Sequence, residues 1–203
     1  MSIVKAMVNI RGVRPMLMHC FTTDTISLEK KERTGVAGND PEEWKRSFMS
    51  NADGQLFIDP SYVFGCLREA ARYTKKGRGS IQSAVAASLQ VLDEQVLMNR
   101  FVPSNLMEVI HNDPTQPVYV DVRSVRNPAT KGRNVRYRLA VSTGWEAAFT
   151  IMWDNTLVNR DQMHAVCIDA GALVGLADGR AIGFGRFEIT SFVIIDNAQK
   201  TTA

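Results

Sequence analysis

The segment from Gly171 to Phe187 reads GALVGLADGRAIGFGRF and separates a helix-like pattern from a strand-like one. It holds five glycines within the fifteen residues 171–185. Glycine at this density either lets the backbone approach a ligand closely or lets a loop pack flat across a sheet. In the first case exposed N–H groups bind phosphate, and Arg180 and Arg186 add charge-assisted contacts. In the second case the segment is a structural turn between a helix and a strand.

The glycine spacing excludes two common nucleotide-binding motifs. No Gly-Lys-Ser/Thr follows, as a P-loop requires, and a helix rather than a strand precedes the glycines, unlike a dinucleotide fingerprint. Nucleotide-dependent enzymes of those classes are therefore not predicted.

Upstream, residues 118–141 alternate apolar and polar side chains on either side of a long loop, which predicts a β-hairpin. Six cations and one acid, Asp121, give this segment a net charge of +5, more than the +3 of the whole chain. The two-residue period of a strand places most of these cations on one side and at the tip. Phosphate backbone is the natural counter-charge of such a stripe, and a merely solvated face is the alternative. The six cations are Arg123, Arg126, Lys131, Arg133, Arg136 and Arg138.

A third cationic cluster, Lys75, Lys76 and Arg78, follows a predicted helix and is a weaker signal, because charged helix ends are common. Three aromatic residues lie near the cationic segments in the sequence. They either stack on splayed bases, as in many single-strand binders, or belong to the core. These residues are Tyr73, Tyr137 and Phe184.

The pattern along the chain predicts strands interleaved with helices. Strands are expected at residues 3–10, 55–58, 118–125, 135–141, 145–153 and 187–195, with an extended segment at 91–102. Helices are expected from Pro60 to Ala71, at 81–91 and at 161–173, with a helical turn starting at Asp40. Residues 22–55 read as an acidic insertion of no assigned role, and 196–203 as a tail of the single domain 1–203. This order fits an α+β fold with an antiparallel sheet and helices on one face, the ferredoxin-like arrangement, carrying a basic hairpin insertion.

Composition bounds the class of protein. The 203 residues are 45% hydrophobic and 22% charged, which is typical of a folded domain. Three scattered cysteines, Cys20, Cys66 and Cys167, indicate buried free thiols rather than a disulfide framework or a zinc site. No apolar run approaches the length of a membrane span, so we expect a cytoplasmic protein without membrane contact.

Two stretches resemble the RAMP (repeat-associated mysterious protein) superfamily. Residues 57–71, FIDPSYVFGCLREAA, resemble its strand-to-helix signature, and residues 175–187 resemble its glycine-rich loop and following strand. The resemblance implies a modified RNA-recognition-motif fold and a role like that of the backbone subunits of CRISPR effectors, which polymerise along guide RNA. Carried over by position, it implies that six residues face RNA: Arg68, Gly179, Arg180, Gly183, Gly185 and Arg186.

Some relatives of that superfamily cleave RNA with an early histidine or an aspartate in an N-terminal loop, and His19 and Asp24 lie in that region. A lone histidine is more often structural, and the sequence contains no Ser/His/Asp or Cys/His arrangement. We therefore expect no enzyme activity, no cofactor and no metal.

The sequence leads to one principal hypothesis: a non-catalytic subunit that binds single-stranded nucleic acid, expected to be guide RNA, in several copies alongside other effector subunits. Three alternatives remain open. They are a phage single-stranded DNA-binding or annealing protein, an RNA-processing endonuclease of the same fold, and a structural subunit that binds no nucleic acid.

Overall fold

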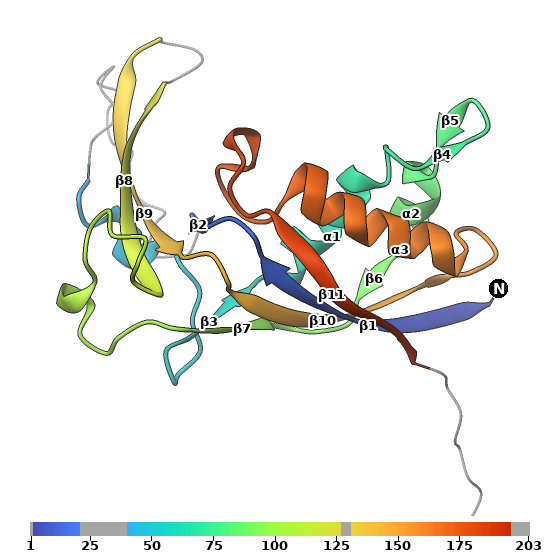
Figure 1. Cartoon of the computed structure of the whole chain (residues 1–203), viewed down its shortest axis with the longest axis horizontal. Helices are drawn as coiled ribbons and strands as arrows, with labels where there is room; N and C mark the ends of the chain where they lie inside the picture. The colour runs from blue at the N-terminus through green and yellow to red at the C-terminus, as the bar shows by residue number, and fades with distance from the viewer. Residues whose placement is uncertain (1, 21–39, 127–130, 196–203) are drawn as a thin grey trace, which may run out of the picture.

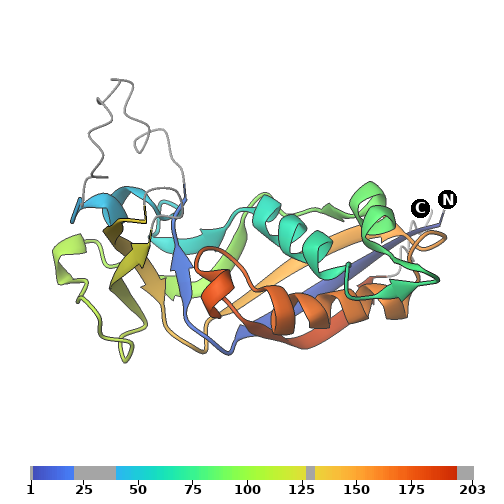
Figure 2. The same cartoon turned by 90° about the horizontal axis from the view of Figure 1, so that it is seen from above.

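The computed structural model describes residues 2–20, 40–126 and 131–195. Its main sheet has the strand order β11-β1-β10-β7-β3, with β6 also pairing with β10, and each of these pairings is antiparallel. These strands are β1 (Ile3–Gly12), β3 (Gln55–Ile58), β6 (Gln90–Val91), β7 (Val96–Phe101), β10 (Glu146–Asp154) and β11 (Phe187–Ile195). The α-helices α1 (Pro60–Ala70), α2 (Gln82–Ser88) and α3 (Arg160–Asp169) lie on one side of this sheet (Figures 1 and 2). The predicted α+β class and the mainly antiparallel sheet are confirmed.

The core lies between the helices and the inner face of the sheet. In β1 the residues Val4, Ala6, Val8 and Ile10 alternate with more exposed ones, as expected for a strand with one covered face. Their partners on β10, which include Phe149 and Ile151, are buried on the same side. On the outer face, Ile3, Met7 and Val193 are about half exposed.

The predicted hairpin is present and belongs to a second sheet at one end of the first (Figure 1). It consists of β8 (Val118–Arg126) and β9 (Arg133–Val141), with β2 (Met16–Met18) pairing with β9. The strand β2 is absent from the sequence prediction, because three residues after Pro15 are too short to show a period.

Several helices differ from the predicted bounds. Helix α2 is shorter than 81–91, since Leu89 leaves the helix for the strand β6. Helix α3 ends at Asp169 and continues as a π-helical turn, η4 (Ala170–Val174). A Cβ atom at Gly171 would lie 2.1 Å from the carbonyl oxygen of Phe187, so glycine allows this turn to touch β11.

The remaining elements are short. A two-stranded ribbon, β4 (Lys75–Lys76) with β5 (Gly79–Ser80), stands where the sequence predicts a helix end. The 3-10 helices are η2 (Glu43–Arg46), η3 (Leu106–Glu108) and η5 (Arg180–Ile182). Residues 22–39 of the predicted insertion and the predicted tail 196–203 lie outside the described ranges. The helical turn expected at Asp40 is η2, which buries Trp44. None of the helices within the described ranges is long and apolar enough to cross a membrane.

Candidate nucleic-acid interface

The glycine-rich loop, defined here as residues 175–185, packs against the base of the hairpin (Figure 1). Phe184 of the loop contacts a small buried cluster of Leu17, Tyr119 and Ala140. The guanidinium of Arg123 lies 4.4 Å from the centroid of the Phe184 ring. Two segments that lie more than thirty residues apart in the sequence therefore meet in the fold.

The glycines serve the loop's own geometry. Gly175, Gly179, Gly183 and Gly185 all have positive φ, and a Cβ atom at Gly185 would lie 2.0 Å from the carbonyl oxygen of Leu176. The amides of Gly179, Gly183 and Gly185 already donate to Asp178, to the carbonyl of Arg180 and to the carbonyl of Pro15. These amides are committed to the turn in this structure, which favours the alternative of a structural turn between helix and strand.

The hairpin cations divide into a paired base and an unpaired tip. Cross-strand register places Asp121 opposite Arg138 and Arg123 opposite Arg136, so all four share one face, as predicted. Three arginines of this face form ion pairs: Arg123 with Asp121, Arg136 with Glu43, and Arg138 with Asp178.

Arg138 is 7% exposed, and its Nε lies 3.0 Å from Asp178 Oδ2, close enough for an ion pair but not aligned as a hydrogen bond. The base of the hairpin thus carries less free charge than its sequence indicates. At the tip, Arg126, Lys131 and Arg133 are exposed, and none has a carboxylate within 4.0 Å in the described part of the chain.

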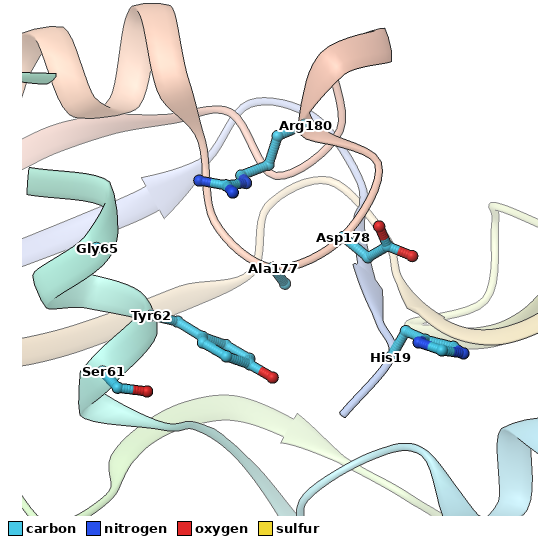
Figure 3. Close-up of a pocket in the computed structure, with 7 residues that line it drawn as sticks. All are labelled: His19, Ser61, Tyr62, Gly65, Ala177, Asp178 and Arg180. Atoms are coloured by element: carbon cyan, nitrogen blue, oxygen red, sulfur yellow. The ribbon is translucent and has the colours of Figure 1, made fainter. Parts of the chain in front are cut away.

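A first cavity of about 350 Å³ separates α1 from the glycine-rich loop. Ser61, Tyr62 and Gly65 of α1 form one wall, and Ala177, Asp178 and Arg180 form the other (Figure 3). The Tyr62 phenol points into the space between them, and the Arg180 guanidinium extends toward α1. A Cβ atom at Gly65 would meet nothing within 4 Å, so this side of the helix faces open space.

A second cavity of about 440 Å³ continues the separation toward the other end of α1. It shares Ala177, Asp178 and Arg180 with the first cavity and adds Glu69, Arg72, Tyr73 and Arg186. Arg180 Nη1 lies 3.3 Å from Glu69 Oε2 and so bridges the loop and α1 where the cavities meet. We call the two cavities together the trough.

Two polar groups at the first cavity have fixed roles. Burial and a hydrogen bond with Cys20 raise the pKa of Tyr62 to about 12, so the phenol is neutral at physiological pH and can donate. His19 Nε2 lies 3.2 Å from Glu43 Oε1, which also accepts from Arg136 Nη1 at 2.7 Å. The imidazole at the cavity is therefore tied to the hairpin through one carboxylate.

The other predicted residues are scattered. Arg68 is exposed on α1 beside the ring of Phe64. Lys75, Lys76 and Arg78 lie in the β4–β5 ribbon, which Figure 1 places away from the hairpin. Tyr137 is half-buried against the core and lies edge-on to His111, which favours the core alternative for this ring.

Sequence reasoning missed the helical wall of the trough. Tyr62, Gly65 and Glu69 follow one another at intervals of three and four residues, which places them on one face of α1, and Arg72 follows in the turn after the helix. That polar and small-residue stripe, opposite the apolar positions of the same helix, is the signal that identifies the wall.

Among the residues that the structure describes, no cluster of three or more His, Cys, Asp or Glu side chains is arranged to hold a metal ion. Asp24, the second nuclease candidate, lies outside the described ranges. The three cysteines are buried and unbridged, as predicted.

Comparisons with known proteins give likenesses in structure but none in sequence. No family model and no curated protein matches the sequence. A chain in a solved structure described as "Cryo-EM structure of the Type III-B Cmr-beta bound to cognate target RNA" is similar, with a TM-score of 0.48 and 14% identity. The match covers 96% of this chain and 61% of that one, so the protein spans about three fifths of the length of the chain it resembles. A likeness of this degree does not by itself assign a function.

Proposed function

We propose that this protein binds single-stranded nucleic acid along the trough, with RNA as the preferred strand, and does not cleave it. In this proposal it is a subunit present in several copies, together with other subunits, in a CRISPR-type effector complex. The assignment to that kind of complex rests on the resemblance of residues 57–71 and 175–187 to the RAMP superfamily. Both segments contribute side chains to the walls of the trough.

The fold supports this proposal. With β3 and α2 set aside, the main sheet and helices run along the chain as β1, α1, β6 and β7, β10, α3, β11, which matches the β-α-β-β-α-β order of ferredoxin-like domains. We take the domain to be a ferredoxin-like variant in which β3 extends the sheet and the hairpin is the insertion.

The observation that carries the proposal is the position of Ala177, Asp178 and Arg180, which line both cavities opposite α1. A trough lined by Tyr62, Tyr73 and Arg180 offers aromatic faces and a cation to a strand whose bases are unstacked. The unpaired cations at the hairpin tip extend the positive surface for the phosphate backbone. In contrast, the outer face of the main sheet presents exposed aliphatic residues such as Met7 and Val193.

Crosslinking tests where the strand lies. Ultraviolet irradiation of the protein with an unstructured oligoribonucleotide, followed by peptide mapping, should place crosslinks in α1 and in residues 171–186. Crosslinks confined to β1, β10 and β11 would instead place the strand on the outer face of the sheet and refute the trough. Competition between RNA and DNA oligomers of the same sequence tests the preference, because only RNA offers the 2′-hydroxyl group. Equal competition would favour a single-stranded DNA-binding or annealing protein.

One observation supports a second candidate, an RNA-processing endonuclease. His19 lines the first cavity and is oriented by Glu43, an arrangement that suits an imidazole for acid–base work. Incubation of a hairpin RNA with the wild-type protein and with His19→Ala, without added metal, separates the two candidates. Cleavage by the wild type that the variant loses would replace the non-catalytic proposal.

A further inference from the structure

Arg186 has an unusual environment at the second cavity. It follows the glycine-rich loop directly, and its Nη1 is buried without a hydrogen-bond partner. No carboxylate lies within 4.0 Å of its guanidinium in the described ranges. The side chain as a whole is half-buried, but a buried nitrogen without a partner is unfavourable for the folded chain, because nothing satisfies its hydrogen bonds.

Two further groups make the same cavity suitable for a nucleotide. Arg72 lies over the ring of Tyr73, 4.7 Å from its centroid, and donates to the Tyr73 hydroxyl group at 2.6 Å. Tyr73 is 39% exposed and Leu173, which also lines the cavity, is 45% exposed. The cavity therefore combines cationic groups with exposed flat and aliphatic surfaces, which are the features that bind a phosphate and a base together.

Glu69 is the one acidic side chain of α1 in this cavity, and it holds Arg180. Both members of this pair are more than two fifths exposed, so the pair itself contributes little to stability. Its carboxylate occupies the place beside Arg180 that an incoming phosphate oxygen would take.

We infer that the cavity formed by Arg72, Tyr73, Arg180 and Arg186 is a nucleotide-binding subsite, in which a phosphate replaces Glu69 beside Arg180 and Arg186 while a base stacks on the Tyr73–Arg72 pair. This inference rests on the proposed function and adds the register of the strand: one nucleotide lies at the end of α1, beyond the first cavity. The shared ligand chemistry is a phosphate ester with an attached base, either within the strand or at its terminus.

Opposite changes in affinity test the subsite. Arg186→Leu should weaken binding of an oligoribonucleotide about tenfold, since one charge-assisted contact is lost. The slope of log K against log salt should become shallower by about 0.7 in the same variant. Tyr73→Leu should weaken binding about tenfold through loss of stacking. Glu69→Gln should tighten binding several-fold, because it removes the competing carboxylate.

The control is Arg11→Gln, which removes one positive charge from an exposed residue of β1 outside the trough. It should leave the affinity within about twofold of the wild type at moderate salt, because a distant exposed charge is screened. Thermal unfolding of every variant shows whether a loss of affinity follows from a loss of fold. Arg186→Leu should unfold no earlier than the wild type, because the unpaired buried nitrogen is removed.

Titration by calorimetry separates the sources of the phosphate and the ways in which the inference can fail. Oligoribonucleotides with a 5′-hydroxyl group, oligoribonucleotides with a 5′-phosphate, and adenosine monophosphate serve as probes. If Arg186→Leu loses the same amount of affinity for both oligomers, the subsite holds an internal phosphate. If it loses affinity only for the 5′-phosphorylated oligomer or for the mononucleotide, the subsite holds a terminal phosphate. If the wild type binds RNA and Arg186→Leu and Glu69→Gln bind it equally well, the subsite is refuted while the proposed function stands. If the wild type binds none of the probes, both are refuted.

Discussion

Gly65 offers a change that should stabilise the fold and weaken binding at once. It lies inside α1, and a Cβ atom there would meet nothing within 4 Å. Glycine inside a helix costs about 1 kcal/mol relative to alanine, so Gly65→Ala should raise the free energy of unfolding by about that amount. For a chain of 203 residues this corresponds to a rise in the thermal midpoint of about 2–4 °C. Gly65→Gln should be stabilising for the same reason, although by less.

The two substitutions should differ in their effect on the strand. A glutamine side chain at position 65 extends into the first cavity, whose volume is about 350 Å³ and whose opposite wall is the glycine-rich loop. Displacing one stacked base costs about 1–3 kcal/mol, so the affinity for an oligoribonucleotide should fall about tenfold or more. Fluorescence anisotropy measures this loss, and circular dichroism gives the thermal midpoint.

Ala86→Gln is the matched control, because it adds the same side chain to an exposed position of α2 outside the trough. It should leave the affinity unchanged. Wild-type affinity in Gly65→Gln would refute the trough as the binding site, and a lower thermal midpoint in Gly65→Ala would refute the view that this helix face is open.

Three further predictions concern the loop, its attachment and pH. Gly185→Ala should destabilise the fold by about 3 kcal/mol, because alanine is strained at positive φ and its Cβ atom would clash with the Leu176 carbonyl group. Calorimetry should show a thermal midpoint about 10 °C lower, and an unchanged midpoint would contradict this account. Arg138→Met removes the cation beside Asp178, so hydrogen exchange of the loop amides should accelerate about tenfold if that ion pair holds the loop, and unchanged exchange would show that it does not. Burial raises the pKa of Cys66 to about 12, above its unfolded value. The stability that this thiol contributes is therefore complete below pH ~8.5 and is lost as the pH rises toward 12. The thermal midpoint should fall across this range, and it should fall less steeply in Cys66→Ala.

The strands could be predicted largely from periodicity. Residues 55–58 and 187–195 form β3 and β11 with the predicted bounds, and the hairpin 118–141 appears with Asp121, Arg123, Arg136 and Arg138 on one side. Alternation identifies β3 because one of its faces is turned to the core, whereas four successive residues at the base of each hairpin strand are buried on both faces. The start of α1 at Pro60 is also as predicted, and the structure shows the Asp59 side chain accepting from the Ser61 amide as its cap.

The charge distribution of the site could not be predicted from the sequence. Arg136 is paired with Glu43, ninety-three residues away, and Arg138 with Asp178, so the sequence alone gave no reason to treat these cations as neutralised. The sequence likewise leaves open whether the glycines bind phosphate or form a structural turn, because the hydrogen bond from the Gly185 amide to the Pro15 carbonyl depends on the tertiary structure. Ion pairs between distant segments form only in the tertiary structure, whereas the net charge of a sequence segment treats every charged side chain as unpaired.

The four internal ion pairs of Arg123, Arg136, Arg138 and Arg180 make strand capture an exchange reaction rather than a simple addition. A phosphate that takes over one of these arginines sets a carboxylate free, and that carboxylate then gathers mobile cations from the solvent. Cations released from the polynucleotide are partly recaptured by the protein, so the net number of ions liberated is smaller than the number of arginines engaged. Titrations against salt would consequently undercount the contacts at the base of the hairpin and report chiefly those at its tip.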